Sequence, residues 1–512
     1  MSTKPLYSYP ESIGRTGAFA GMQISARWFW LSCGALAVLA VWPLWTTLYP
    51  GMTDYPNHLA RAQLIVDDLL HAREHPYYEL RHVLIPNLAL DTLVPLLVIG
   101  GLSVNEALKL FAAVALLLPV AGVIALARVL QGGTPWLALL AFPLAFSRYY
   151  AWGFLNYFFA IGLALLAFAG WLRLRQRQPM LAGLALALTG ALTMMSHLMG
   201  FGVLALLVLS HEGWLVWRAR HIAIRALVPT LLALAACAAF YLLAFERGLA
   251  PDVRWLDSPM RKLRHLVSPF IAYEVLPALV VATLVIGALL LARWKKHLVM
   301  QPGWLPPVAV FMVVFLLMPT VIMNSSFASA RLFIVPVLVF LAFATLRSDA
   351  RMQVAIALVA VLATAVKTVD VQEQWQRTSA RHEQLREALQ VLPEASRLAT
   401  VVAVQRRDFI DVYPVRHAAA FAIVDRQAYI PNFFGFPFNG EAVAFKPEVQ
   451  PLTRQLFKDF VVYQADEPVP WDTLCRQFDA VLVIEQGRRA ALPGCARPLR
   501  MGEGFAIYRL VR

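Results

Sequence analysis

The chain has 512 residues, of which 59% are hydrophobic and 15% are charged, and its formal net charge is +14. Soluble proteins carry about a quarter charged residues, so this composition excludes an ordinary soluble protein and indicates a polytopic membrane protein. Residues 371–512 contribute only +2 of the net charge. Much of the remainder falls in short basic clusters between apolar runs, a pattern that orientation in a membrane explains better than a nucleic-acid partner.

Residues 1–27 are polar and weakly basic, which predicts a cytoplasmic tail with no cleavable signal peptide. Residues 28–370 predict an α-helical transmembrane domain, because each span needs about twenty mostly apolar residues. Eleven spans are expected, at residues 28–48, 105–129, 134–148, 152–172, 180–198, 199–217, 227–245, 273–292, 304–322, 331–347 and 352–370.

Residues 87–101 are also apolar, but the stretch is short and contains Asp91 and Pro95. Later basic clusters are expected to face the cytoplasm, and they comprise Arg173, Arg175 and Arg177, then Arg218, Arg220 and Arg225, then Arg293, Lys295 and Lys296. If the N-terminus is cytoplasmic, these basic clusters face the cytoplasm only when residues 87–101 do not cross the membrane. We therefore expect a juxtamembrane helix there, within a first external loop at residues 49–104.

Residues 371–512 predict a small extracytoplasmic α/β domain, with a helical stretch at 372–392 and strands near 398–404, 480–484 and 502–511. Cys475 and Cys495 can pair if this domain lies in an oxidising compartment, and otherwise they remain free thiols. An aromatic loop at residues 430–438 indicates either contact with the membrane or a lipid-linked substrate, or packing beneath its own domain.

Asp54 is the first candidate for chemistry, because it stands alone just after the first span, in a turn framed by Pro50, Gly51 and Pro56. A partly buried aspartate can act as a general base that takes a proton from a hydroxyl group. The same residue can instead cap the helix that follows it. His58 lies one helical turn later, where it can shuttle a proton, hold a phosphate or simply face solvent.

Other polar residues are expected on the same external face as Asp54. His197 lies between two spans, a depth at which ionisable residues are candidates for function. Arg331 opens a late span, where its guanidinium can bind a phosphate or reach toward the membrane interface. A basic cluster, comprising Arg261, Lys262 and Arg264, can bind a phosphate or anionic lipid headgroups.

The order of these features resembles the GT-C class of membrane glycosyltransferases, which includes protein O-mannosyltransferases and the lipid A aminoarabinose transferase. The resemblance rests on a first span followed by Asp54, an amphipathic helix at 58–70, a His-Pro-Tyr-Tyr stretch at 75–78 and the surface helix at 87–101. It implies that Asp54 is the catalytic base and that Arg331 meets the phosphate of a polyprenyl carrier. The class often has a second acid where this chain has Asn156, which can orient a substrate but is neither a base nor a strong metal ligand. No cofactor is therefore expected, and a divalent metal stays open as an alternative that the sequence does not support.

The expected function is that of an inverting glycosyltransferase on the external face of a bacterial inner membrane. Its partners would be a lipid-linked sugar donor, an envelope glycan, lipid or protein acceptor, and membrane lipids. Two alternatives stay open, a transporter or flippase of lipid-linked glycans and a non-catalytic envelope scaffold. The polar residues gather at one face rather than at mid-membrane, which favours the enzyme. We further expect Asp54 and Arg331 to line one cavity.

Overall fold

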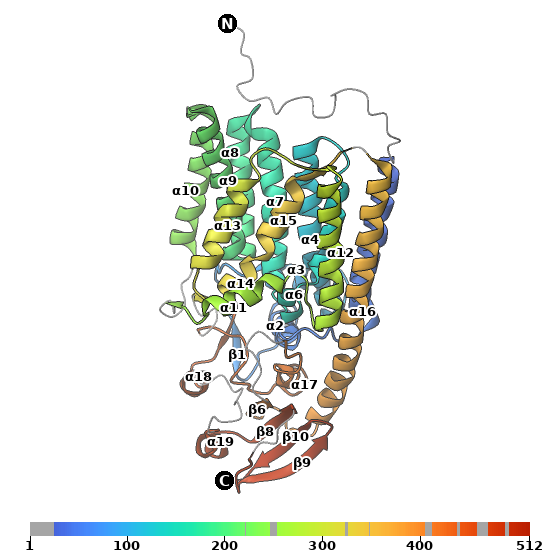
Figure 1. Cartoon of the computed structure of the whole chain (residues 1–512). Helices are drawn as coiled ribbons and strands as arrows, with labels where there is room; N and C mark the ends of the chain where they lie inside the picture. Colours follow the sequence, from blue (N-terminus) through green and yellow to red (C-terminus); the bar gives the residue numbers. More distant parts are fainter. Residues whose placement is uncertain are drawn as a thin grey trace.

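The structure is a computed structural model, and it describes residues 25–220, 222–245, 253–322, 326–347, 349–404, 412–437, 441–457, 469–486 and 491–511. Most of the expected N-terminal tail, the start of the loop at 246–272, and Phe438 of the aromatic loop lie outside these residues. A bundle of long helices makes up one part of the molecule, and a smaller part that contains the C-terminal sheet lies below it (Figure 1).

Eight helices of the described chain are long and apolar enough to cross a membrane: α1 (Ala26–Thr46), α4 (Val104–Gln131), α7 (Leu155–Arg175), α8 (Pro179–Ser196), α9 (Leu198–Ala219), α10 (Ile224–Ala244), α12 (Val275–Trp294) and α16 (Ala350–Leu389). The other three expected spans are short or broken, and they comprise η1 (Trp136–Ala141) with α5 (Phe142–Ala145), α13 (Leu305–Leu317), and α14 (Ala328–Leu332) with α15 (Ile334–Phe343). The expected α-helical polytopic membrane fold is confirmed.

The η1–α5 segment replaces the regular helix expected at residues 134–148. The side-chain amide of Gln131 donates to the Ala344 carbonyl before the segment, and the backbone N–H of Arg148 donates to the Ser268 carbonyl after it. Every residue of η1 and α5 is buried. Because lipid does not reach its backbone, this irregular segment is tolerated at membrane depth.

The first loop contains α2 (Tyr55–His71), β1 (Tyr78–Leu80) and α3 (Ala89–Ile99). The N–H of Leu88, just before α3, donates to the Met195 carbonyl at the end of α8. The side chain of Asn105, just after α3, donates to the Leu48 carbonyl at the end of α1. Both ends of α3 therefore lie at the same end of the bundle, and the expected juxtamembrane helix is confirmed.

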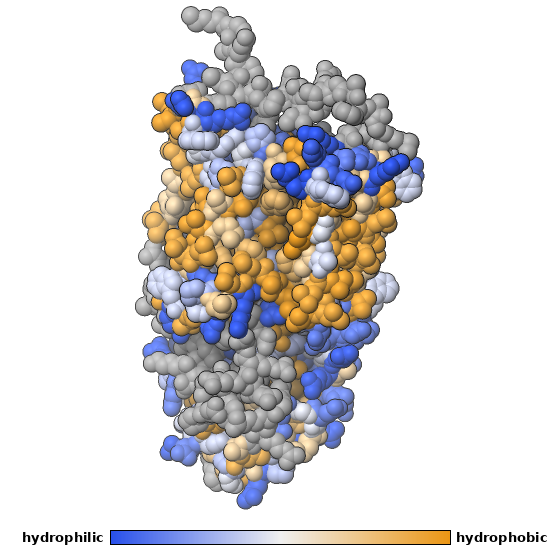
Figure 2. Space-filling model, in the orientation of Figure 1, coloured by the Kyte–Doolittle hydropathy of each residue, from blue (hydrophilic) through white to orange (hydrophobic). Residues whose placement is uncertain are grey.

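The surface of the bundle supports a membrane setting. Figure 2 shows a broad hydrophobic band across the helices, with polar residues gathered above and below it. Large apolar side chains are exposed along the helices, among them Leu188, Leu232, Leu279, Leu290 and Leu358. A water-facing surface of this kind would be unfavourable, so lipid is the solvent that the band fits.

We call the end of the bundle that meets the C-terminal part the site end. The basic clusters lie at the opposite end, where α7, α9 and α12 finish and α16 begins. Short elements complete both ends: α6 (Arg148–Trp152), α11 (Pro259–Arg264) with η2 (His265–Val267), the strand pair β2 (Val253–Arg254) and β4 (Val321–Ile322), and the pair β3 (Leu298–Met300) and β5 (Ala344–Leu346).

The C-terminal part begins within α16, which runs unbroken through the expected domain boundary at residue 371. A four-stranded sheet follows in the order β6-β8-β10-β9, built from β6 (Leu398–Val404), β8 (Ala480–Gln486), β9 (Ala496–Gly502) and β10 (Phe505–Leu510). β6 and β8 are parallel, whereas β10 pairs antiparallel with β8 and β9. The remaining elements are η3 (Ala418–Ala420), α17 (Phe421–Arg426), β7 (Val443–Phe445), α18 (Gln450–Phe457) and α19 (Trp471–Gln477). The three expected strands and the expected α/β character are present.

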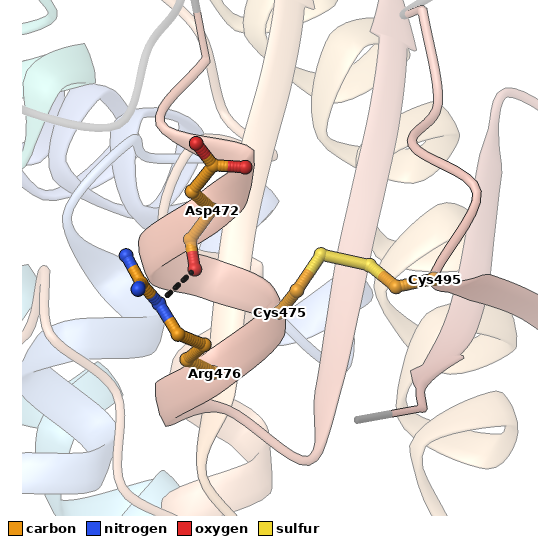
Figure 3. Close-up of a disulfide and its surroundings, with 4 residues drawn as sticks. All are labelled: Asp472, Cys475, Arg476 and Cys495. Atoms are coloured by element: carbon orange, nitrogen blue, oxygen red, sulfur yellow. Dashed lines mark hydrogen bonds between the residues drawn. A yellow bond between two sulfur atoms is a disulfide. The ribbon is translucent and has the colours of Figure 1, made fainter.

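A disulfide joins Cys475 of α19 to Cys495, which precedes β9 (Figure 3). On the neighbouring turn of α19, Nε of Arg476 donates to the carbonyl oxygen of Asp472 at 3.0 Å. The disulfide fastens α19 to the edge of the sheet. Of the two alternatives for Cys475 and Cys495, a disulfide or two free thiols, the structure has the disulfide.

The C-terminal part is joined to the first loop by several contacts. β1 pairs antiparallel with β7, with Tyr78 opposite Phe445. Arg386 of α16 forms an ion pair with Asp425 at 2.5 Å and also contacts the Tyr49 hydroxyl. Phe433 of the aromatic loop is buried between Tyr78 of β1 and Phe445 of β7, so this ring packs at the junction of the C-terminal part with the first loop.

Candidate active site

A cavity of about 260 Å³ lies at the site end, between the helices and the C-terminal part. It is lined by Asp54, His58, Asn87, Trp152, Gly153, Phe154, Leu155, Asn156, Tyr157, His197, Ser326, Phe327, Arg331, Arg416, His417, Phe434 and Glu441. Five of the individual site residues expected from the sequence are among them: Asp54, His58, Asn156, His197 and Arg331. The structure therefore brings together residues from α2, α7, α14, the α8–α9 junction and the turn after α1.

Backbone contacts with α6 hold Asp54 at the cavity. Its N–H donates to the Trp152 carbonyl at 2.9 Å, and the neighbouring N–H of Thr53 donates to the Ala151 carbonyl at 3.2 Å. Gly153 allows the close approach, because it has φ +102° and a β-carbon there would lie 2.9 Å from that of Asp54. Asp54 precedes α2, but its side chain makes no capping hydrogen bond. The carboxyl group is therefore available to the cavity.

The cavity raises the pKa of Asp54 to about 7, because burial penalises the charged carboxylate more than Arg416, Arg331 and Arg61 favour it. A general base works best when its pKa lies near the working pH. Nε2 of His417 lies 3.6 Å from Oδ1 of Asp54. Burial, Arg416 and His58 hold the pKa of His417 well below its usual range, so this imidazole is neutral.

His58 and Asn156 support the wall of the cavity. Nε2 of His58 donates to the Gly153 carbonyl at 2.8 Å, and burial lowers the pKa of His58 to about 3. Oδ1 of Asn156 accepts from the Leu90 N–H at 2.9 Å, while its Nδ2 donates to the Asn87 carbonyl at 2.8 Å. Asn156 thus fastens the start of α3 to α7, and His58 fastens α2 to the turn that carries Gly153.

Arg331 lies in α14 and is only 3% exposed. Its guanidinium carbon lies 4.1 Å from the centre of the Phe154 ring, and its side chain donates to the carbonyl oxygens of Ser326 and Phe327. Tyr157 donates from its hydroxyl to the Arg331 carbonyl at 2.9 Å. These contacts hold a cation in the cavity wall.

His197 has an extended backbone between α8 and α9, and its Nδ1 accepts from the Met199 N–H at 3.1 Å. Its ring lies against Tyr157, with ring centres 5.5 Å apart. Burial and Arg331 lower the pKa of His197 to about 3, so it contributes a neutral ring to the cavity.

The basic cluster of α11 has a different environment. Nζ of Lys262 donates to the carbonyl oxygens of Phe315, Leu316 and Met318, at 3.2, 2.5 and 2.9 Å, and so caps the end of α13. Arg261 is half exposed and donates to the Leu256 carbonyl at 3.2 Å. Neither these two residues nor Arg264 is among the described residues that line the cavity.

Sequence reasoning missed three residues that the C-terminal part supplies, Arg416, His417 and Glu441, whereas the fourth, Phe434, belongs to the aromatic loop that the sequence singled out. One local signal points to the first two, because they are the only charged or ionisable groups besides Tyr413 in an apolar run at residues 412–424. Glu441 carries no such signal. It belongs to a buried cluster in which Arg61 pairs with Glu441 at 2.7 Å and with Asp91 at 2.7 Å.

No protein-family model matches the chain, and no curated protein matches its sequence. Among solved structures, ArnT from Cupriavidus metallidurans bound to undecaprenyl phosphate is similar, with a TM-score of 0.51, 12% sequence identity, and coverage of 95% of this chain and 98% of ArnT. The arabinofuranosyltransferase AftD from Mycobacteria matches with a TM-score of 0.45 and 14% identity, and this chain covers 42% of it. The likeness to ArnT confirms, at the level of the fold, the resemblance to the GT-C class: the chain is a multi-pass membrane protein with an ArnT-like fold.

Proposed function

We propose that this protein is a membrane glycosyltransferase that transfers a sugar from a polyprenyl-phosphate carrier to an acceptor of the cell envelope. The observation that carries the proposal is that Asp54 and Arg331 line the same cavity. One supplies a carboxylate near an acceptor hydroxyl, and the other supplies a cation near a phosphate. The ArnT-like fold adds support, because that structure is described as bound to undecaprenyl phosphate.

The proposed reaction is a single displacement. Asp54 takes the proton of the acceptor hydroxyl as its oxygen forms a bond to the anomeric carbon. The bond between that carbon and the phosphate oxygen breaks, and its electron pair leaves with the polyprenyl phosphate. Attack opposite to the leaving group inverts the anomeric configuration. A pKa of about 7 for Asp54 suits it to this proton transfer.

Charge neutralisation at the leaving phosphate is assigned to arginine side chains rather than to a metal ion. Guanidinium groups donate paired hydrogen bonds that match the geometry of phosphate oxygens. Arg331 is already fixed at the wall by Ser326, Phe327 and Phe154. It therefore offers a preorganised positive charge where negative charge develops on the leaving group.

We also propose that the site end faces the periplasm of a bacterium. The basic clusters at the opposite end agree with a cytoplasmic placement of that end. The Cys475–Cys495 disulfide belongs to the C-terminal part, and disulfides are favoured in oxidising compartments. The acceptor would then be an envelope glycan, lipid or protein.

The test uses the purified full-length protein and a panel of polyprenyl-phosphate sugars, with release of polyprenyl phosphate as the measured product. Wild-type protein should release the carrier only when an acceptor is present, and Asp54→Asn should lose about 10²–10⁴-fold in rate. Asp68→Asn is the matched control, because Asp68 lies in α2, the helix that follows Asp54, but is not among the residues that line the cavity. Sugar transfer at the wild-type rate in Asp54→Asn would refute the proposal.

A further inference from the structure

Arg416 stands apart from the other cations near the cavity. It lines the cavity, and its guanidinium carbon lies 5.9 Å from the centre of the Trp152 ring. Among the residues that the structure describes, its side chain has neither a hydrogen-bond acceptor nor a carboxylate within ion-pair distance. Its guanidinium is therefore available to a ligand in the cavity.

The other cations near the cavity have protein partners. Arg61 is held by Asp91 and Glu441, and Lys262 donates to three backbone carbonyls. Arg331 donates to the carbonyls of Ser326 and Phe327. Arg416 is partly exposed where it lines the cavity, so its guanidinium can bind an anion that enters the cavity.

Arg416 and Arg331 lie over two neighbouring aromatic rings that both line the cavity. The rings of Trp152 and Phe154 are stacked, with centres 6.3 Å apart and an interplanar angle of 24°. Arg416 lies by the first ring and Arg331 by the second. Two guanidinium groups on adjacent rings can contact different oxygens of one phosphate group.

Asp54 does not compete strongly for Arg416. It is the described carboxyl whose charge acts on Arg416, yet burial keeps the pKa of Asp54 at about 7, so a large fraction of it is neutral near that pH. A phosphate, in contrast, stays anionic and can accept several hydrogen bonds.

We propose that Arg416, acting with Arg331, binds the phosphate group of the polyprenyl-phosphate donor, so that the C-terminal part completes the donor site. This inference rests on the proposed function and assigns one of its binding residues. The pairing of β1 with β7 joins the part of the chain after residue 371 to the first loop. Closer to Arg416, Nε2 of His382 in α16 donates to the Pro414 carbonyl at 3.2 Å.

The experiment measures binding of undecaprenyl phosphate, undecaprenol and phosphatidic acid to the purified full-length protein, together with its melting temperature without ligand. The variants are Arg416→Gln and Arg416→Lys, and the control is Arg377→Gln, because Arg377 is an exposed arginine of α16 that pairs with exposed Glu373. Arg416→Gln should weaken binding of undecaprenyl phosphate about ten- to hundred-fold, the loss expected for a hydrogen-bonded charge. Arg416→Lys should bind undecaprenyl phosphate with an intermediate affinity, because lysine keeps the positive charge but lacks the paired donors of the guanidinium group.

The ligand-free melting temperature separates a binding role from a structural one. Removing a cation without a protein partner should leave it unchanged or raise it. A lower melting temperature in both Arg416 variants would overturn the assignment. Undiminished binding of undecaprenyl phosphate by Arg416→Gln would also overturn it and leave the proposed function standing. If wild-type protein binds undecaprenol or phosphatidic acid as tightly as undecaprenyl phosphate, the assignment of Arg416 and the proposed function are both overturned.

Discussion

Nε2 of His417 lies 3.6 Å from Oδ1 of Asp54, so the C-terminal part of the chain approaches the proposed base directly. The imidazole is buried and neutral, and its Nε2–H can face the carboxylate without adding a charge. Arg416, the neighbouring residue in the chain, lowers the pKa of Asp54. The base is therefore set by groups from both ends of the chain.

The pH dependence of activity should report the ionisation of Asp54. Only the carboxylate can accept a proton, so kcat/KM should rise with pH through a pKa of about 7 and then level off. Arg416 lowers the pKa of Asp54, so Arg416→Gln should move this rising limb to higher pH. Measurement of kcat/KM on both sides of pH 7 checks this, and an unshifted limb in the variant would show that Arg416 does not act on Asp54.

Asp54→Asn should stabilise the protein in alkaline solution while it abolishes activity. The pKa of Asp54 is about 7 when folded and 3.8 in the reference state, so its contribution to stability falls as pH rises between these values and is least above pH 7. Removing the charge should then gain up to ~4 kcal/mol. Melting temperatures at pH 8 and pH 5 test this, with the larger gain expected at pH 8. A variant less stable than wild type at pH 8 would contradict the buried position of this carboxyl.

Gly153→Ala should displace Asp54. The added β-carbon would lie 2.9 Å from the β-carbon of Asp54, and φ at this residue is +102°. The backbone strain should cost about 1–2 kcal/mol, and a displaced catalytic group can lose roughly 100-fold in rate. Gly170→Ala is the control, because its β-carbon would meet no atom within 4 Å. Turnover and melting temperature of the two variants should differ accordingly, and equal turnover would argue against a tight fit at Gly153.

The cluster of Arg61, Asp91 and Glu441 contains two carboxyl groups for one guanidinium. Burial, with the nearby Asp91, raises the pKa of Glu441 to about 8 against the effect of Arg61, so Glu441 is largely protonated at pH 7. Glu441→Gln should therefore change stability by less than about 1 kcal/mol. Arg61→Met should cost about 3–5 kcal/mol, because it leaves a buried carboxylate unpaired. Unfolding measured on both variants at pH 7 tests the difference, and a large loss in Glu441→Gln would show that Glu441 is ionised.

Removal of divalent metal should leave sugar transfer unchanged. In the proposed reaction, arginine side chains neutralise the leaving phosphate. Turnover with and without EDTA, followed by addition of Mg²⁺ or Mn²⁺, checks this. A loss on chelation that is reversed by one of these ions would assign that role to a metal.

Most of the membrane domain could be predicted from the sequence. Apolar runs located the long helices, and the basic clusters showed that residues 87–101 do not cross, which the contacts of Leu88 and Asn105 confirm. The expectation that Asp54 and Arg331 share a cavity is also met. These inferences succeeded because lipid imposes length and charge rules that act locally along the chain.

The C-terminal contribution to the site could not be predicted in the same way. Glu441 lies next to the pairing of β1 with β7, and the loop that carries Arg416 is held by the contact of His382 with the Pro414 carbonyl, and such long-range contacts leave no periodic trace in the sequence. β9 was missed because this edge strand is exposed along most of its length and includes Arg497 and Arg500, so it lacks the apolar alternation of a buried strand. Lys262 reads as a candidate phosphate ligand in the sequence, but its carbonyl partners in α13 are distant in the chain.

The continuity of α16 determines how the C-terminal part is oriented around the bundle axis. Its forty residues span ~60 Å, about twice the thickness of a bilayer core. Beyond the membrane, Trp375 donates to the Tyr273 hydroxyl and Ser379 accepts from the Tyr49 N–H, so the helix is fixed to the site end along its side. One residue inserted after Ser379 would turn everything beyond it by ~100° and move it by ~1.5 Å. The number of residues in this helix thus fixes the rotation of the C-terminal part about the helix axis. That rotation determines whether Arg416 and His417 face Asp54 or face away from it.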